Sequence, residues 1–153
     1  MAVKPIPDGY HTVTPYLVAK DAEQLLKFLN DAFGAKEHDI TRGEDGSIWH
    51  ADMMVGDSHI MLSQANERFQ PTSSAVYLYV PDTDATYRAA LAAGGTSVME
   101  PADQFYGDRN AGVKDAQGNF WWIGTHVEDV APDEMQRRTK AAAAERARAA
   151  TTA

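Results

Sequence analysis

The chain has 153 residues, a formal net charge of −8 and 44% hydrophobic residues. This size fits one compact domain or two small modules that share a core, and the acidic balance argues against a nucleic-acid partner. The absence of cysteine excludes disulfides, thiolate metal sites and a cysteine nucleophile. No apolar run reaches the roughly 18 residues of a membrane span, and residues 1–9 lack the apolar core of a signal peptide, so we expect a cytoplasmic protein without a membrane partner.

The first half of the chain has the pattern of one strand, one helix and three further strands. Residues 11–18 are rich in β-branched and aromatic side chains and predict a strand. Asp21 then caps a helix whose apolar residues recur at helical spacing until Gly34 ends it. Turn signals separate the three strands expected next, at residues 35–41, 47–55 and 58–63. We therefore predict a β-α-β-β-β module at residues 10–63.

The second half repeats this pattern after a polar linker at residues 64–74. The offset is 61 residues without a gap, so that Asp21 corresponds to Asp82 and Gly34 to Gly95. The second module is expected at residues 75–131, with strands at 75–80, 96–100, 110–114 and 119–126. Because a doubled unit can close around a shared cavity, we predict an α+β fold of tandem βαβββ modules that form a curved mixed sheet around that cavity.

Residues 132–153 differ in composition from both modules. Their alanines and arginines favour a helix, but Met135 is the only large apolar residue that such a helix could bury. We therefore predict a helical tail that docks through its first turns and frays toward its end.

Several motifs follow one another in the order found in a known superfamily: TPYLV at 14–18, AFGA at 32–35, HAD at 50–52, GDSHIML at 56–62, QFYGDR at 104–109 and THVEDV at 125–130. With the doubled module, they resemble the vicinal oxygen chelate superfamily of glyoxalase I, bleomycin-resistance proteins and extradiol dioxygenases. The motifs are most similar to those of its PhnB-like, glyoxalase-related branch. The resemblance covers roughly residues 10 to 138 and implies the glyoxalase/bleomycin-resistance fold, a homodimer and a small-molecule ligand.

Metal-dependent members of this superfamily carry His or Glu ligands at equivalent points of the two modules. Carried onto this chain, these positions are Thr14, Met61, Ala75 and Trp122. None suits a divalent cation, because threonine is a poor neutral donor, methionine sulfur favours soft ions, and alanine and tryptophan offer no ligand atom. The resemblance therefore implies a protein without this metal, and we expect no cofactor.

Other histidines provide a fallback metal set. His50 and Asp52 lie two residues apart on one strand face, and His59 faces the same way as Met61, so these three residues form that set. Hydrogen bonding within the sheet is the alternative role for them. The remaining histidines lie near element ends, where we expect them to face solvent: His11, His38 and His126.

Strand alternation predicts the cavity lining. If the four metal positions face inward, so do the residues two positions away on each strand. The inward set is aromatic and polar, whereas the opposite set is nearly all aliphatic and suits packing under the helices. With two residues of the 104–109 loop, the predicted ligand site comprises Tyr16, His59, Met61, Tyr77, Tyr79, Tyr106, Arg109, Phe120 and Trp122.

Arg109 has two possible roles, a clamp on a ligand carboxylate or phosphate and an ion pair that fixes its own loop. Arg42 is another possible anion contact, although a surface role suits it equally.

Three functions are compatible with these residues. The first is binding of a small, aromatic organic molecule in a metal-free, aromatic-lined cavity. The second is a metal-dependent lyase or isomerase of the glyoxalase type that uses the fallback ligands. The third is a homologue without a ligand, whose rings fill its own core. No catalytic residue is predicted.

Overall fold

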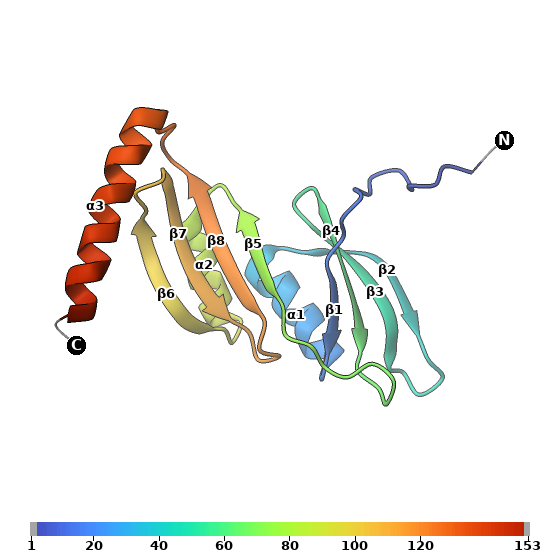
Figure 1. The fold of residues 1–153 in the computed structure, drawn as a ribbon. Helices are drawn as coiled ribbons and strands as arrows, with labels where there is room; N and C mark the ends of the chain where they lie inside the picture. Colours follow the sequence, from blue (N-terminus) through green and yellow to red (C-terminus); the bar gives the residue numbers. More distant parts are fainter. Residues whose placement is uncertain (1–2, 152–153) are drawn as a thin grey trace.

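The computed structural model describes residues 3–151, which fold into two four-stranded mixed sheets and three helices (Figure 1). The first module consists of β1 (Tyr16–Ala19), α1 (Ala22–Phe33), β2 (Lys36–Arg42), β3 (Ile48–Val55) and β4 (Ser58–Gln64). The second consists of β5 (Ala75–Tyr79), α2 (Thr83–Ala92), β6 (Thr96–Asp103), β7 (Asp108–Lys114) and β8 (Phe120–His126). The long helix α3 (Pro132–Thr151) follows. The predicted β-α-β-β-β order is thus confirmed in both halves.

The two sheets have the same topology. Their strand orders are β1-β4-β3-β2 and β5-β8-β7-β6, with a parallel first pair and antiparallel pairs beyond it. Tyr16 pairs with Met61 in the first sheet, and Tyr77 pairs with Trp122 in the second, so the register obeys the 61-residue offset. Within residues 3–151 no ladder joins the sheets, and their edge strands β1 and β5 face each other (Figure 1). The expected curved sheet is therefore divided in two.

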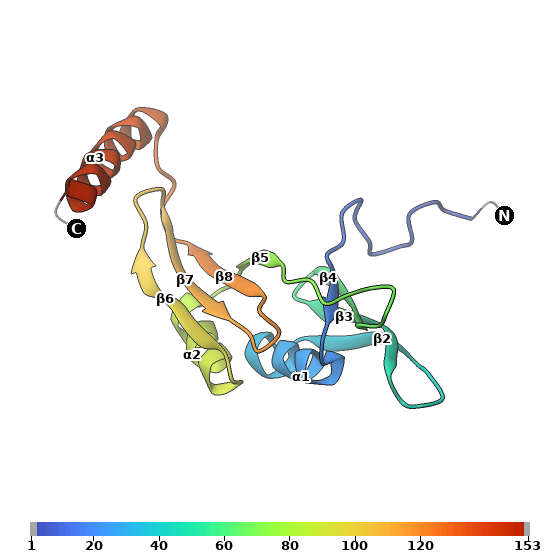
Figure 2. The same ribbon diagram turned by 60° about the horizontal axis from the view of Figure 1, so that its bottom comes forward.

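Helices α1 and α2 lie on the same side of the two sheets (Figure 2). The aliphatic faces of the strands are buried beneath them, as the alternation predicted, with Leu17, Leu62 and Ile123 at most 1% exposed. The fully buried Trp121 of β8 contacts Phe33 of α1, with ring centroids 5.1 Å apart. Because a helix of the first module packs on a strand of the second, the two modules share one hydrophobic core.

Both module helices begin as predicted. The Asp21 side chain accepts a hydrogen bond from the Gln24 amide at 3.0 Å, and the Asp82 side chain accepts one from the Ala85 amide at 2.9 Å. Gly34 ends α1 in the left-handed conformation, with a φ of 64°. These caps fix where each helix starts on the sheet.

Two segments differ from the prediction. The first strand begins at Tyr16 rather than at residue 11, because Pro15 lacks an amide proton and only its carbonyl joins the ladder, accepting from the Met61 amide at 2.9 Å. The expected loop before residue 110 belongs to the hairpin of β6 and β7. The tail forms the predicted helix, continuous to Thr151, and no residue of α3 in the described range is buried. Among these residues, no helix combines the length and apolar character needed to cross a membrane.

Candidate functional site

Each sheet has an open face, defined here as the face turned away from α1 and α2. Aromatic side chains from the predicted site lie on these faces in contact with solvent. Tyr16 of the first sheet is 49% exposed, and Tyr77 and Tyr79 of the second are 40% and 69% exposed. The open faces therefore expose large aromatic side chains to solvent.

A buried carboxylate, Asp108, organises the open face of the second sheet. Its Oδ2 accepts hydrogen bonds from the hydroxyls of Tyr79 at 2.9 Å and Tyr77 at 3.2 Å, while its Oδ1 lies 2.8 Å from Nδ1 of His126. Burial opposes ionisation, but the hydrogen bonds from His126 and the two tyrosines outweigh it and hold the pKa of Asp108 below its ordinary value. The carboxylate therefore stays charged and orients both phenol rings.

The pKa values of two partners of Asp108, His126 and Tyr77, are also shifted. Nε2 of His126 lies 2.9 Å from Asp129, so hydrogen bonds to Asp108 and Asp129 raise the pKa of His126. Burial raises the pKa of Tyr77 to about 12. At neutral pH, Tyr77 is therefore a hydrogen-bond donor and not a phenolate.

Asn110 lies two residues further along β7, on the same face. Its side-chain amide donates to the Tyr106 hydroxyl at 2.6 Å. Its Oδ1 is buried and has no hydrogen-bond partner among residues 3–151, and Asn110 as a whole is only 5% exposed. A buried acceptor without a partner costs about 1–3 kcal/mol, and this oxygen is free to accept a hydrogen bond.

Two glycines flatten the surface around Asn110. A Cβ on Gly124, the cross-strand partner of Asn110, would lie 2.2 Å from the Tyr77 hydroxyl oxygen. A Cβ on Gly112 would lie 2.5 Å from Cζ3 of Trp122. Because both positions lack a side chain, the rings of Tyr77 and Trp122 lie directly over the backbone and form an aromatic platform beside Asn110.

The structure divides the predicted ligand site between the two sheets. The second sheet and the loop before β7 carry six of its members, namely Tyr77, Tyr79, Tyr106, Arg109, Phe120 and Trp122. Phe120 lies at the far end of this sheet, where the ammonium group of Lys114 is 5.4 Å from its ring centroid. Tyr16, His59 and Met61 belong to the first sheet.

Arg109 does not extend onto the open face. Its guanidinium is bound by Asp84 of α2 at 2.5 and 2.9 Å and by Asp103 at 3.0 Å, so it fixes its loop rather than presenting a free anion site. Arg42 is paired with Glu23 and with the carbonyl of Gly46.

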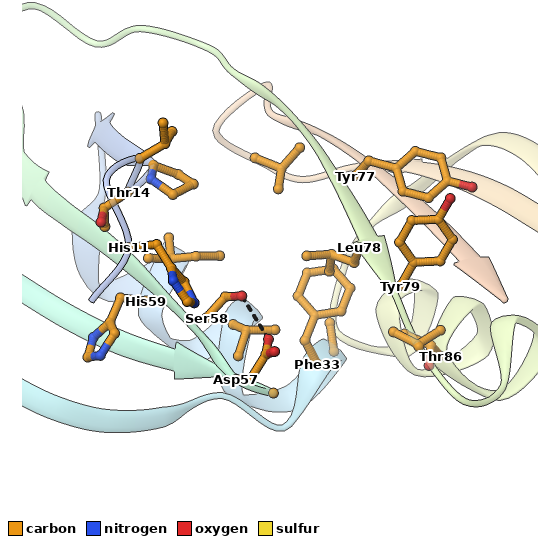
Figure 3. A pocket seen from close by; sticks show the side chains of 18 of the residues that line it. His11, Thr14, Phe33, Asp57, Ser58, His59, Tyr77, Leu78, Tyr79 and Thr86 are labelled. Carbon is orange, nitrogen blue, oxygen red and sulfur yellow. Dashed lines mark hydrogen bonds between the residues drawn. The ribbon is translucent and has the colours of Figure 1, made fainter. Parts of the chain in front are cut away.

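A cavity of about 720 Å³ lies between the two modules (Figure 3). His11, Thr14 and Ser58 come from its first-module side, and Tyr77 and Tyr79 come from β5. Of the four metal positions, Thr14 alone belongs to the cavity wall. A hydroxyl, a thioether, a methyl group and an indole do not make a donor set for a divalent cation, so these residues do not fit the metal of the metal-dependent members.

The histidine cluster of the first sheet differs from the fallback set. Nδ1 of His59 lies 2.8 Å from Oδ1 of the buried Asp52, as the spacing suggested. His50, however, lies beside Tyr16, with ring centroids 5.9 Å apart. His38 lies beside His59 instead, with the two ring centroids 4.9 Å apart. His38 is exposed, as expected, and its ring also contacts that of His59.

Tyr10 covers this histidine cluster from the N-terminal segment. Its ring stacks on His59 with centroids 3.8 Å apart, and its hydroxyl donates to Asp52. This hydrogen bond raises the pKa of Tyr10 to about 12. Figure 3 shows the ring of His59 directed away from the tyrosines of the second module. The cluster belongs to the first module, and His59 also lines the cavity between the modules.

This chain is similar to a family model, to a related sequence and to several solved structures. Residues 10–123 match the family described as the Glyoxalase/Bleomycin resistance protein/Dioxygenase superfamily. An uncharacterized protein of Mycobacterium tuberculosis is 34% identical over 135 residues, which cover 81% of this chain and 79% of that protein. TioX from Micromonospora sp. ML1 has a similar structure, with a TM-score of 0.66, 24% identity and coverage of 76% of this chain and 99% of that one. The PhnB protein from Bacillus cereus is similar at a TM-score of 0.57, with 19% identity and coverage of 75% and 99%.

Proposed function

The chain belongs to the glyoxalase/bleomycin resistance protein/dioxygenase superfamily, and on this premise we propose that it binds a small planar organic molecule on the open face of its second sheet. The ligand stacks on the aromatic platform and donates one hydrogen bond to Asn110. No metal at the family's usual position takes part, because the residues there supply no ligand set.

The unpaired oxygen of Asn110 is the observation that carries this proposal. The amide nitrogen of Asn110 is already bound to Tyr106, and the nearby Asp108 is satisfied by three donors. The buried Oδ1 of Asn110 is therefore the acceptor left for a ligand. It selects a molecule with an N–H or O–H group, since an acceptor at this point would be repelled.

The rings around this oxygen define the shape of the ligand. Trp122 and Tyr77 lie over glycines and present flat surfaces, which favour a planar aromatic molecule through stacking. The carboxylate of Asp108 is compensated by His126, so the site offers no strong attraction for a cation, and a carboxylate does not attract an anion. A neutral aromatic molecule with one hydrogen-bond donor fits these features.

The test uses two probes that differ only in the donor, indole and 1-methylindole. Binding is followed by NMR through the side-chain N–H signal of Trp122, assigned with a Trp122→Phe variant. We expect indole to bind about 5- to 150-fold more tightly, which corresponds to the roughly 1–3 kcal/mol of a hydrogen bond to a buried acceptor.

The variant Asn110→Leu removes the acceptor and keeps the approximate shape of the side chain. It is expected to abolish the preference for indole while the stacking contacts keep both probes bound. Gln104→Leu, which removes an amide from the loop before β7, is the matched control and retains the preference. Equal affinities for the two probes in the wild type, or a preference that survives Asn110→Leu, would contradict the proposal.

A further inference from the structure

We propose a metal site on the open face of the first sheet, formed by His38, Asp52 and His59, that binds a divalent transition-metal ion such as Zn²⁺. It lies within one module and shares no residue with the proposed ligand site on the second sheet. It also differs from the four positions that hold the metal in metal-dependent members of the superfamily, none of which contributes here.

The three side chains converge from three neighbouring strands. One potential ligand atom from each lies within 4.8 Å of the other two. His38 reaches the group because β2 is irregular at this point: Glu37 pairs with Met53 and Asp39 pairs with Asp52, which leaves His38 as an extra residue in the strand. Such a bulge redirects a side chain, and bulges are frequent beside functional sites.

The burial of Asp52 supports a bound cation. Asp52 is 1% exposed and His59 is 7% exposed. The hydrogen-bond partners of this carboxylate are the hydroxyl of Tyr10 and the imidazole of His59, neither of which carries a permanent positive charge. A buried carboxylate is costly unless a cation compensates it, and a divalent ion would supply that charge.

The ligand types define the class of ion. Two imidazoles and one carboxylate favour zinc and its transition-metal neighbours over Mg²⁺ or Ca²⁺, which prefer oxygen ligands. With bonds of about 2.0–2.1 Å, two ligand atoms of a tetrahedral ion lie roughly 3.3 Å apart. Nδ1 of His59 and Oδ1 of Asp52, at 2.8 Å, are already near this separation. The exposed His38 can rotate to bring its ring nitrogen to the remaining distance.

The test uses full-length protein without a histidine tag, stripped of metal with a chelator that is then removed. Titration calorimetry with Zn²⁺ is expected to show one ion per chain, whereas Mg²⁺ gives no binding. Addition of Co²⁺ is expected to give the visible absorption of a protein-bound ion. His38→Ala is expected to weaken Zn²⁺ binding at least about tenfold.

His50→Ala is the matched control, because His50 lies on the same strand as Asp52 but contacts Tyr16 instead of the cluster. It is expected to leave Zn²⁺ affinity unchanged. The exposed position of His38 keeps its own variant folded, which circular dichroism verifies. Absence of Zn²⁺ binding to the wild type, or equal effects of His38→Ala and His50→Ala, would overturn the proposal. Neither result bears on indole binding to the second sheet, so each proposal can be contradicted without affecting the other.

Discussion

His126 holds both ring nitrogens against carboxylates, and this arrangement makes the stability of the protein depend on pH. Asp108 and Asp129 raise the pKa of His126 above its ordinary value of about 6.5. The stabilisation is therefore fully present below that ordinary value and is lost as the pH rises through the higher value of the folded state. Asp108 does not interfere in this range, because its own pKa is lowered.

The variant His126→Gln is expected to lose more stability relative to the wild type at about pH 5.5 than at about pH 9. Urea unfolding at the two pH values measures the difference. Asp129→Asn, which removes one of the two carboxylates, is expected to reduce this pH dependence without abolishing it. A stability difference that stays constant, or grows, toward high pH would contradict the assignment of His126 as a stabilised cation.

Among single residues, alternation along the strands placed Tyr77, Tyr79 and Trp122 on the face opposite to the aliphatic one, and of these the two tyrosines line the cavity between the modules. Asn110 was missed because its strand carries none of the four metal positions from which the alternation was counted, and Asp108 was missed because the strand was predicted to start at residue 110. Counting backward from Lys114 in steps of two would have found both residues. His38 could not be found in this way, because the bulge in β2 breaks the alternation.

Among the elements, α3 contacts the body of the protein through Arg138. Arg138 binds Glu128 through two nitrogens at 2.7 and 2.8 Å and also donates to the carbonyl of Phe105. No residue of α3 in the described range is buried, so apolar packing contributes little to its position. The helix is therefore held mainly by polar contacts near its first turns.

Arg138→Ala is expected to make the amides of α3 exchange with deuterium about two- to fivefold faster, as suits the loss of an exposed ion pair, while β7 and β8 remain unchanged. Hydrogen exchange with mass spectrometry measures both regions. Arg137→Ala is the control, because Arg137 pairs with Glu134 inside the same helix and its loss leaves the contact with Glu128 intact. Equal exchange of α3 in the two variants would refute the role of Arg138.

Local signals were sufficient to predict the module helices and most strands. Each of these signals acts within one element and can therefore be predicted from the sequence. They are the capping residues Asp21 and Asp82 and the spacing of apolar residues between each cap and the following glycine. The continuous tail shows the limit of this reasoning. Alanine and arginine predicted a helix docked through its first turns, but the partners of Arg138, Glu128 and the carbonyl of Phe105, are tertiary contacts that composition does not reveal.

For the whole molecule, the sequence predicted the duplication but not how the two sheets relate. The two modules have equivalent edge strands. The sequence therefore does not distinguish modules that pair within one chain from modules that pair between two chains. The structure shows β1 and β5 as separate edges with a cavity between the modules, and both open faces expose aromatic side chains. A single chain thus leaves uncovered the surface that we propose binds the ligand.

We propose that a second copy of the chain covers part of these faces in a homodimer. The exposed rings of Tyr16, Trp49 and Tyr79 supply the aromatic surface typical of an interface core. Sedimentation velocity is expected to give about twice the chain mass of 16.7 kDa. Tyr16→Lys places a charge on this surface and is expected to shift the protein to the monomer mass, whereas Ile6→Lys, a similar change of an exposed apolar residue in the N-terminal segment, leaves the dimer intact. A wild type that sediments as a monomer at micromolar concentration would contradict the homodimer, and the ligand site would then have to be complete within one chain.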